Sequence, residues 1–214
     1  MKTEQLELYL VTDRKLAAGK PLPQLVEQAI QGGVTMVQLR EKECSTREFL
    51  ALAEEIHALC RRARVPLIIN DRLDIALAVD AEGVHVGQSD MPAEVARKLL
   101  GKDKIIGLSV ESLEDALAAR HLPVDYLGVS PIYFTPTKTD LTRQLGLEGL
   151  RAIRAVSSLP LVGIGGLHAG NAGDVIRAGA DGVAVVSAIC AAEDPRAAAE
   201  ELRRVIREAK EKKS

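Results

Sequence analysis

Short apolar runs alternate with amphipathic segments along the whole chain, and the alternation occurs eight times. Most of these runs are continuous stretches of Val, Ile and Leu, which is typical of parallel strands covered on both faces. The expected strands cover residues 8–12, 36–40, 66–70, 83–87, 105–109, 126–130, 161–165 and 183–187. The segments between them indicate helices, most clearly at 47–64, 92–100, 147–156 and 195–210.

Glycines mark where several of the expected helices should end, at Gly32-Gly33, Gly101 and Gly179. Successive apolar runs begin about 17–35 residues apart, the spacing that repeated βα units require. Eight such units in 214 residues predict an α/β fold, a small (β/α)₈ TIM barrel formed as one domain over residues 1–214. A doubly wound open sheet is the alternative, but it usually has fewer strands, and no GxGxxG motif follows the first run.

Composition agrees with this class and excludes several kinds of partner. Hydrophobic residues make up 47% of the chain and aromatic residues only 2%, so the core must be aliphatic. The net charge of -2 favours neither nucleic acid nor an anionic membrane as a partner. The cysteines, Cys44, Cys60 and Cys190, have no metal-site spacing. No signal sequence or membrane-spanning run is apparent, so a cytoplasmic protein is expected, and a homo-oligomer is compatible with the sequence.

The run at 36–40 passes directly into charged residues. Successive side chains of a strand point to opposite faces, so Gln38, Arg40 and Lys42 should share one face. An amide and two cations at the end of a strand could bind a polyanionic ligand. The alternative is an exposed strand edge protected by charges.

Polar and small residues gather at the ends of the other expected strands or just after them, where barrel enzymes place their active sites. They include Asn70, Asp71, Asp90, Ser109, Lys138, Gly165, Gly166 and Ser187. The small residues that follow the last two strands, Val186 among them, predict a phosphate site formed by backbone N–H groups. Alternatively they form tight turns, with Ser187 as a helix cap.

The charges at these strand ends suggest a diphosphate and a metal ion. Arg40, Lys42 and Lys138 supply more positive charge than one phosphate monoester needs. Asp71 and Asp90 then indicate Mg²⁺, which binds few carboxylates together with phosphate oxygens. Both carboxylates could instead cap helices. His85, between two valines, is interpreted as a hydrogen-bonded core residue and not as a general base.

Several stretches together resemble the thiamine-phosphate synthase family over nearly the whole chain. They are LYLVTD, VQLREK, INDRLDIALAVDAEGVHVGQSD, GLSV, the Pro-Ile-Tyr…Thr-x-Thr-Lys loop, VGIGGL and DGVAVVSAI. The resemblance implies a (β/α)₈ barrel and a transferase of thiamine biosynthesis. In the implied reaction, hydroxymethylpyrimidine diphosphate loses pyrophosphate and the nitrogen of hydroxyethylthiazole phosphate takes its methylene carbon, with Mg²⁺ as cofactor.

The resemblance also implies roles for individual residues, with Arg40, Lys42, Ser109 and Lys138 as the catalytic group. The implied ligands of the pyrimidine diphosphate are Gln38, Arg40, Lys42, Asn70 and Lys138, with Ser109 beside the reacting centre. Asp71 and Asp90 are the implied Mg²⁺ carboxylates. The implied thiazole-phosphate side comprises Thr135, Thr137, Gly165 or Gly166, Val186 and Ser187. Ser130 and Phe134 depart from the family pattern, where Gly and Pro are usual, and should alter the hinge of the loop at 131–143.

Three other functions share parts of this pattern. A related thiazole tautomerase group has the phosphate site but lacks most of the diphosphate residues, and carries a histidine where this chain has Ser130. A non-catalytic barrel that binds thiamine phosphate would need fewer charges. A phosphosugar isomerase or tryptophan-pathway barrel should offer an acid/base pair at the strand ends, which the sequence does not show.

The long loop at 131–143, with Lys138, is expected to close over the substrates as a lid.

Overall fold

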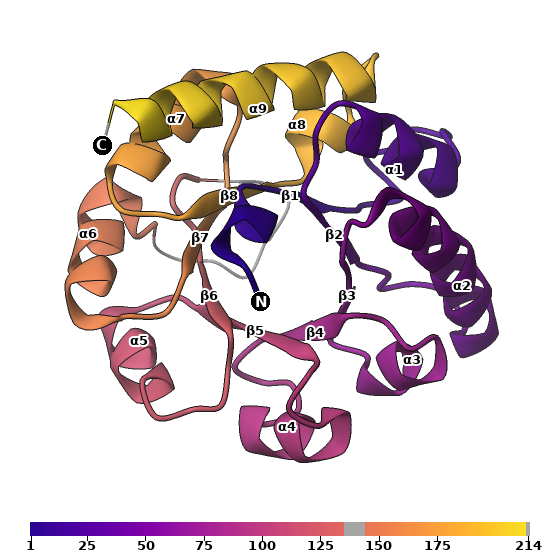
Figure 1. Cartoon of the computed structure of the whole chain (residues 1–214), viewed down its shortest axis with the longest axis horizontal. Helices are drawn as coiled ribbons and strands as arrows, with labels where there is room; N and C mark the ends of the chain where they lie inside the picture. Colours follow the sequence, from indigo (N-terminus) through magenta and orange to yellow (C-terminus); the bar gives the residue numbers. More distant parts are fainter. Residues whose placement is uncertain (135–143, 213–214) are drawn as a thin grey trace.

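The computed structural model describes residues 1–134 and 144–212, and within them eight parallel strands close into one barrel (Figure 1). Each strand pairs with the next along the chain, and β8 pairs with β1. The strands are β1 (Leu8–Val11), β2 (Met36–Leu39), β3 (Leu67–Asn70), β4 (Gly83–Val86), β5 (Ile105–Val110), β6 (Tyr126–Val129), β7 (Leu161–Ile164) and β8 (Gly182–Val185). The predicted (β/α)₈ barrel is therefore confirmed, and the open sheet is excluded.

Helices form the outer ring around this barrel (Figure 1). They are α1 (Leu22–Gln31), α2 (Thr46–Ala63), α3 (Leu73–Ala78), α4 (Ala93–Leu100), α5 (Leu113–Ala119), α6 (Gly146–Val156), α7 (Ala169–Arg177), α8 (Ser187–Cys190) and α9 (Pro195–Glu211). No helix in the described part of the chain is long and apolar enough to cross a membrane.

The ends of the helices follow local chemistry that the sequence already indicated. Ser45 accepts a hydrogen bond from the Glu48 N–H, and Glu48 bonds back to Ser45, which forms a capping box at the start of α2. Gly32 and Gly101 are the C-caps of α1 and α4, as predicted. Gly179 lies one residue beyond the C-cap of α7 with φ +119°, a conformation that favours glycine.

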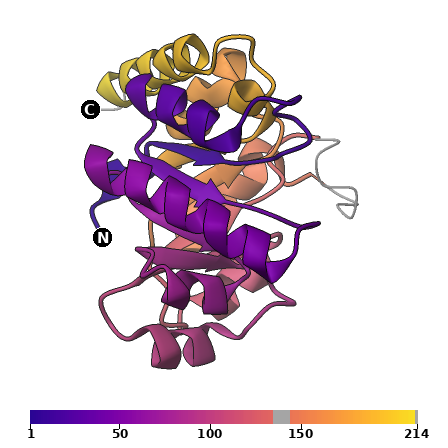
Figure 2. The same cartoon turned by 90° about the vertical axis from the view of Figure 1, so that its right-hand side faces the viewer.

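The core has an outer and an inner layer. The outer layer lies between the strands and the helices and contains residues such as Val37 and Leu39. The inner layer fills the barrel and consists of Leu6, Tyr9, Val11, Met36, Ile68, Ile105, Tyr126, Val162 and Ala184. Leu6 belongs to a short 3₁₀ helix, η1 (Thr3–Leu6), which lies near the barrel axis in Figure 1 and at the left-hand end of the barrel in Figure 2. The barrel is closed at that end by side chains, so the pocket described below opens at the other.

Glu7 connects the first strand to the last helix. Its carboxylate, whose side chain is 12% exposed, accepts hydrogen bonds from Arg203 and Lys210 of α9. Burial alone would raise the pKa of Glu7, but the hydrogen bonds and charges of Lys210 and Arg203 outweigh it and hold that pKa below its ordinary value of 4.5. The ionised carboxylate is therefore the form that stabilises the fold.

We predict that Glu7→Gln lowers the free energy of unfolding at neutral pH by about 2 kcal/mol, the loss expected when charge-assisted hydrogen bonds are removed. Because the folded-state pKa is depressed, the contribution is complete above the unfolded value and is lost as pH falls through the folded value. Urea unfolding at pH 7 and at pH 3 should show a difference between variant and parent that shrinks at the acidic pH. Glu200→Gln, which removes an exposed pair with Arg196 within α9, is the control and should change stability little. A pH-independent difference for Glu7→Gln would contradict the account.

Candidate active site at the carboxyl ends of the strands

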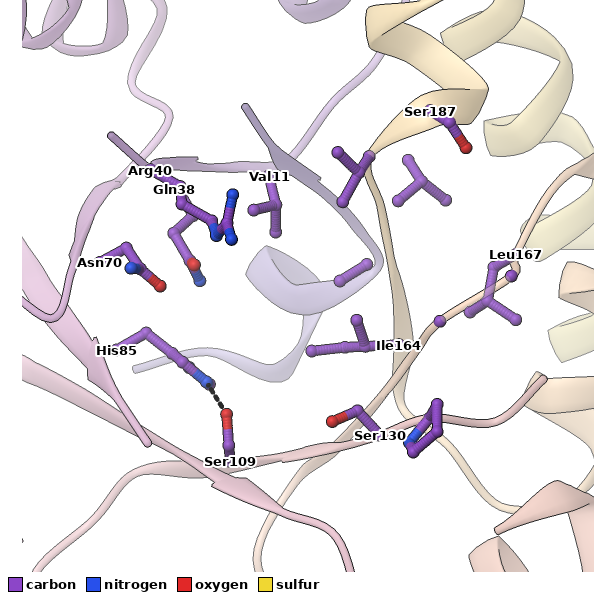
Figure 3. A pocket seen from close by; sticks show the side chains of 16 residues that line it. Val11, Gln38, Arg40, Asn70, His85, Ser109, Ser130, Ile164, Leu167 and Ser187 are labelled. Carbon is purple, nitrogen blue, oxygen red and sulfur yellow. Dashed lines mark hydrogen bonds between the residues drawn. The ribbon is translucent and has the colours of Figure 1, made fainter. Parts of the chain in front are cut away.

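A pocket opens at the carboxyl ends of the strands, and Figure 3 shows it from close by. Eight of the predicted site residues line it: Gln38, Arg40, Asn70, Ser109, Gly165, Gly166, Val186 and Ser187. In Figure 3, Gln38, Arg40, Asn70 and His85 lie on one side, and Ile164, Leu167 and Ser187 lie on the other. The pocket is thus polar on the side of β2 to β5 and mostly apolar on the side of β7 and β8.

Strand β2 positions the first cationic group. Gln38 is 3% exposed and points into the barrel, and Arg40 follows two residues later on the same side. The Arg40 backbone N–H donates to Thr12 Oγ1 at 3.0 Å, and its guanidinium lies 3.5 Å from an oxygen of Asp13. Because the barrel is closed, β2 has no free edge, and the interpretation of these charges as edge protection is wrong.

Lys42 lies beyond the pocket lining and contacts one of the two predicted metal ligands. Its Nζ is 2.6 Å from Asp71 Oδ2, while the Lys42 side chain stays 53% exposed. Asp71 follows β3 and lies close enough to Asp90, which follows β4, to affect the Asp90 pKa. Burial raises the pKa of Asp90, and the Asp71 carboxyl raises it further, against the lowering effects of the Gly87 N–H and of Lys42. A cation at this place would favour the ionised form of both carboxyls.

The alternative that these two aspartates cap helices is wrong. Asp71 has φ +59°, and its N–H donates to the carbonyl of His85 at 2.9 Å. Asp90 Oδ2 accepts from the Gly87 N–H at 2.7 Å and so closes a turn. The N-caps of α3 and α4 are Arg72 and Pro92, and neither helix start has a side-chain capping bond. The turns hold both carboxylates toward each other.

The opposite side of the pocket is formed by backbone and small residues. Gly165 and Gly166 have φ values of +102° and +64°, and a Cβ on Gly166 would lie 2.7 Å from the Phe134 carbonyl oxygen. Asn171 Nδ2 donates to the Gly166 carbonyl at 2.9 Å and fixes this turn. Ser187 is the first residue of α8 and makes no side-chain cap, since Val186 holds the N-cap position. The helix-cap interpretation of Ser187 is therefore wrong, although the residue does line the pocket.

His85 was interpreted from the sequence as a hydrogen-bonded core residue, and the structure confirms that. Its ring is 4% exposed, with Nδ1 2.9 Å from the Tyr126 hydroxyl and Nε2 2.9 Å from the Ser109 hydroxyl. His85 also lines the pocket, which the sequence interpretation missed. The alternation of β4 contained the signal, because Val84 and Val86 pack outward and place His85 on the inner face.

Other pocket residues also went unpredicted. Ser130 lines the pocket beside Ser109, and the apolar wall comprises Val11, Pro131, Ile164, Leu167, Ala184 and Val185. The predicted residues Thr135, Thr137 and Lys138, and the lid expected around them, lie outside the described residues.

Comparison with known proteins decides the family. A family model described as thiamine monophosphate synthase matches residues 8–189, which include every described residue of this site. The chain belongs to the thiamine monophosphate synthase family. The resemblance seen in the sequence is thereby confirmed.

Individual relatives of the thiamine monophosphate synthase family match nearly end to end. The chain is 57% identical to the thiamine-phosphate synthase of Albidiferax ferrireducens, over 96% of this chain and 94% of that one. It is 54% identical to that of Chloroflexus aurantiacus, with the same shares covered. The solved structure of the thiamine phosphate pyrophosphorylase from Pyrococcus furiosus superposes with a TM-score of 0.90 at 43% identity, covering 97% of this chain and 98% of that one.

Proposed function

We propose that this enzyme of the thiamine monophosphate synthase family couples hydroxymethylpyrimidine diphosphate with hydroxyethylthiazole phosphate, yielding thiamine phosphate and pyrophosphate. The observation that carries the proposal is the division of one pocket into a charged rim and a glycine-lined side. Arg40, Lys42 and two carboxylates stand at the rim after β2, β3 and β4, and Gly165, Gly166 and Ser187 stand across from them. The pocket thus offers one place for a diphosphate and another for a phosphate monoester.

Arg40 and Lys42 would stabilise the departing pyrophosphate. As the bond between the methylene carbon and the diphosphate oxygen breaks, its electron pair leaves with the oxygen, and negative charge grows there. Fixed cations stabilise that charge more in the transition state than in the bound substrate. Lys42 already lies against Asp71, so it is held at the rim before any ligand arrives.

Asp71 and Asp90 fit a magnesium ion. The fit rests on two neighbouring carboxyls that repel each other once ionised, and on the raised pKa of Asp90 that burial and Asp71 produce. The described residues contain no cluster of three or more His, Cys, Asp or Glu side chains suited to a metal. Two carboxylates suffice for Mg²⁺ when substrate phosphates supply further oxygens. When bound, the ion would neutralise charge on the diphosphate.

Gln38, Asn70 and Ser109 would hold the aminopyrimidine against the pocket floor. All three carry neutral polar groups, and Gln38 and Asn70 are 3% and 9% exposed. The thiazole nitrogen attacks the methylene carbon with its lone pair and has no proton to lose. A general base is therefore not required, in keeping with the neutral floor. Ser130, at the position expected to hold a histidine in the tautomerase group, supports the synthase over that alternative.

The thiazole phosphate would bind on the side of β7 and β8. Gly165 and Gly166 allow backbone to come close to a phosphate, and Ser187 adds a hydroxyl. Ile164 and Leu167 form the apolar surface next to them, suitable for a five-membered aromatic ring.

The direct test mixes both phosphorylated precursors with Mg²⁺ and the unmodified protein and measures pyrophosphate release. Arg40→Ala and Lys42→Ala should fold normally and lower kcat by about 10²-fold or more, because each loses a charge partner of the transition state. Lys15→Ala removes an exposed lysine that pairs with Glu43 and should leave kcat unchanged. Near-normal turnover in both rim variants would remove them from the mechanism.

Metal dependence is the second prediction of this function. Excess chelator should abolish pyrophosphate release, and added Mg²⁺ should restore it. Asp90→Asn should need a much higher Mg²⁺ concentration to reach half of its maximal rate, because one ionised ligand is lost. Asp80→Asn changes an exposed aspartate paired with Lys104 and should keep the parental Mg²⁺ requirement. Full activity in chelator would contradict the assignment of the carboxylates.

The glycine turn gives a third prediction. Gly166→Ala must place a Cβ against the Phe134 carbonyl in a left-handed conformation, so the turn should shift. We expect the KM for the thiazole phosphate to rise about tenfold or more, with a smaller change in the KM for the pyrimidine diphosphate. Gly19→Ala is the matched control, because Gly19 also has a positive φ, +87°, but nothing lies within 4 Å of its added Cβ. Equal KM changes for both substrates would argue against a phosphate site at this turn.

A further inference from the structure

A chain of hydrogen bonds crosses the barrel interior directly below the pocket. Gln38 Nε2 donates to the Tyr9 hydroxyl at 2.8 Å, and that hydroxyl lies 2.8 Å from the Tyr126 hydroxyl. The Tyr126 hydroxyl is 2.9 Å from His85 Nδ1, and His85 Nε2 is 2.9 Å from Ser109 Oγ. We call these five residues, Gln38, Tyr9, Tyr126, His85 and Ser109, the relay.

The relay is built into the core and returns to the pocket at both ends. Tyr9 and Tyr126 are fully buried, and the two end residues, Gln38 and Ser109, line the pocket. Neighbouring glycines leave the space that the rings occupy. A Cβ on Gly107 would lie 2.2 Å from Tyr126 Cζ and 2.5 Å from His85 Nδ1, so no larger residue fits there with the relay in place.

The two ends of the relay are coupled because each tyrosine hydroxyl has one hydrogen to donate. Gln38 Nε2 donates to the Tyr9 hydroxyl. The Tyr9 hydrogen is then donated to the Tyr126 hydroxyl, and the Tyr126 hydrogen is donated to His85 Nδ1. His85 then carries its proton on Nε2 and donates it to Ser109, whose own hydrogen is directed to another acceptor. In this direction the Gln38 carbonyl oxygen is left to accept in the pocket, and Ser109 is left to donate there.

We propose that Tyr9, Tyr126 and His85 are positioning residues that set this polarity, so that the pocket presents Gln38 Oε1 as an acceptor and the Ser109 hydroxyl as a donor to the aminopyrimidine. The inference rests on the proposed function, because an aminopyrimidine carries amino N–H donors and ring-nitrogen acceptors. Burial raises the pKa of both tyrosines, Tyr9 and Tyr126, well above the ordinary value. Their hydroxyls therefore stay protonated at neutral pH, and the relay keeps its single hydrogens.

A double-mutant cycle between Tyr9 and Ser109 tests the coupling, since the side chains of these two residues are joined through Tyr126 and His85. Tyr9→Phe and Ser109→Ala should each lower kcat/KM for the pyrimidine diphosphate, Tyr9→Phe by about threefold to tenfold. The double variant should be clearly less impaired than the product of the two single effects, because part of the Tyr9 effect reaches the substrate through Ser109. The KM for the thiazole phosphate should not follow these changes. Tyr133→Phe removes the hydroxyl of the third tyrosine, outside the relay, and its effect should simply add to that of Ser109→Ala.

A second measurement does not depend on turnover or on a folded Tyr9 variant. Nitrogen-15 spectra of the unmodified protein, with the His85 signals assigned by their loss in His85→Gln, report which ring nitrogen carries the proton. The relay requires a neutral ring protonated on Nε2, and Tyr126→Phe should shift the Nδ1 resonance. Two results would overturn this inference but leave the proposed function standing. One is a His85 ring protonated on Nδ1, and the other is additive effects of Tyr9→Phe and Ser109→Ala in an active enzyme. Absence of pyrophosphate release by the unmodified protein would overturn the proposed function and the assigned ligand with it.

Discussion

The two-residue alternation of strands in a closed parallel barrel is the constraint on which this structure depends. Every second side chain must point inward, where space is limited and no sheet edge exists to relieve a mismatch. Toward the closed end those positions hold apolar residues such as Met36 and Ile68. Two residues further along the same strands, the inward-facing positions hold Gln38 and Asn70. The barrel thus changes from an apolar core to a polar pocket within two residues, without a separate element to build the site.

Much of this arrangement follows from patterns visible in the sequence, and the rest depends on contacts between distant segments. The apolar runs located each strand to within two residues, and the alternation in 36–42 predicted that Gln38 and Arg40 would face the same way. The hydrogen bond between Tyr9 and Tyr126 joins residues 117 positions apart, and no local pattern indicates it. The turn that Asp90 closes was equally hidden, because its carboxylate bonds to the Gly87 N–H instead of capping the helix that follows it. The spacing of residues along the sequence indicates which side chains share one face of a strand or helix. It does not indicate which residues of distant strands contact each other once the barrel closes.

The charged rim and the relay use opposite solutions to the cost of placing polar groups in a protein. At the rim, the side chains of Lys42 and Asp71 remain 53% and 22% exposed. Both charges therefore stay partly hydrated, which reduces the free-energy cost of desolvating them. In the relay, the tyrosine hydroxyls and the imidazole are buried, and each must be satisfied by a neighbour because a lost partner there is costly. The described side chains include no buried polar atom without a hydrogen-bond partner. The rim can therefore rearrange around a ligand, while the floor cannot.

This difference in rigidity matches what the proposed reaction would ask of each side of the pocket. The leaving diphosphate moves and gains charge as its bond breaks, so groups that can adjust, such as the Lys42 ammonium, suit it. The aminopyrimidine must keep its methylene carbon aimed at the thiazole nitrogen while positive charge forms on the ring. A floor of neutral, fixed dipoles does not repel that charge, and its orientation is set before the substrate binds, so no reorganisation is needed during the step. A charged floor would either oppose the cation or attract the diphosphate to the wrong side. Because the cations stand at the rim and the floor is neutral, the electron pair of the breaking bond is stabilised only when it moves toward the rim.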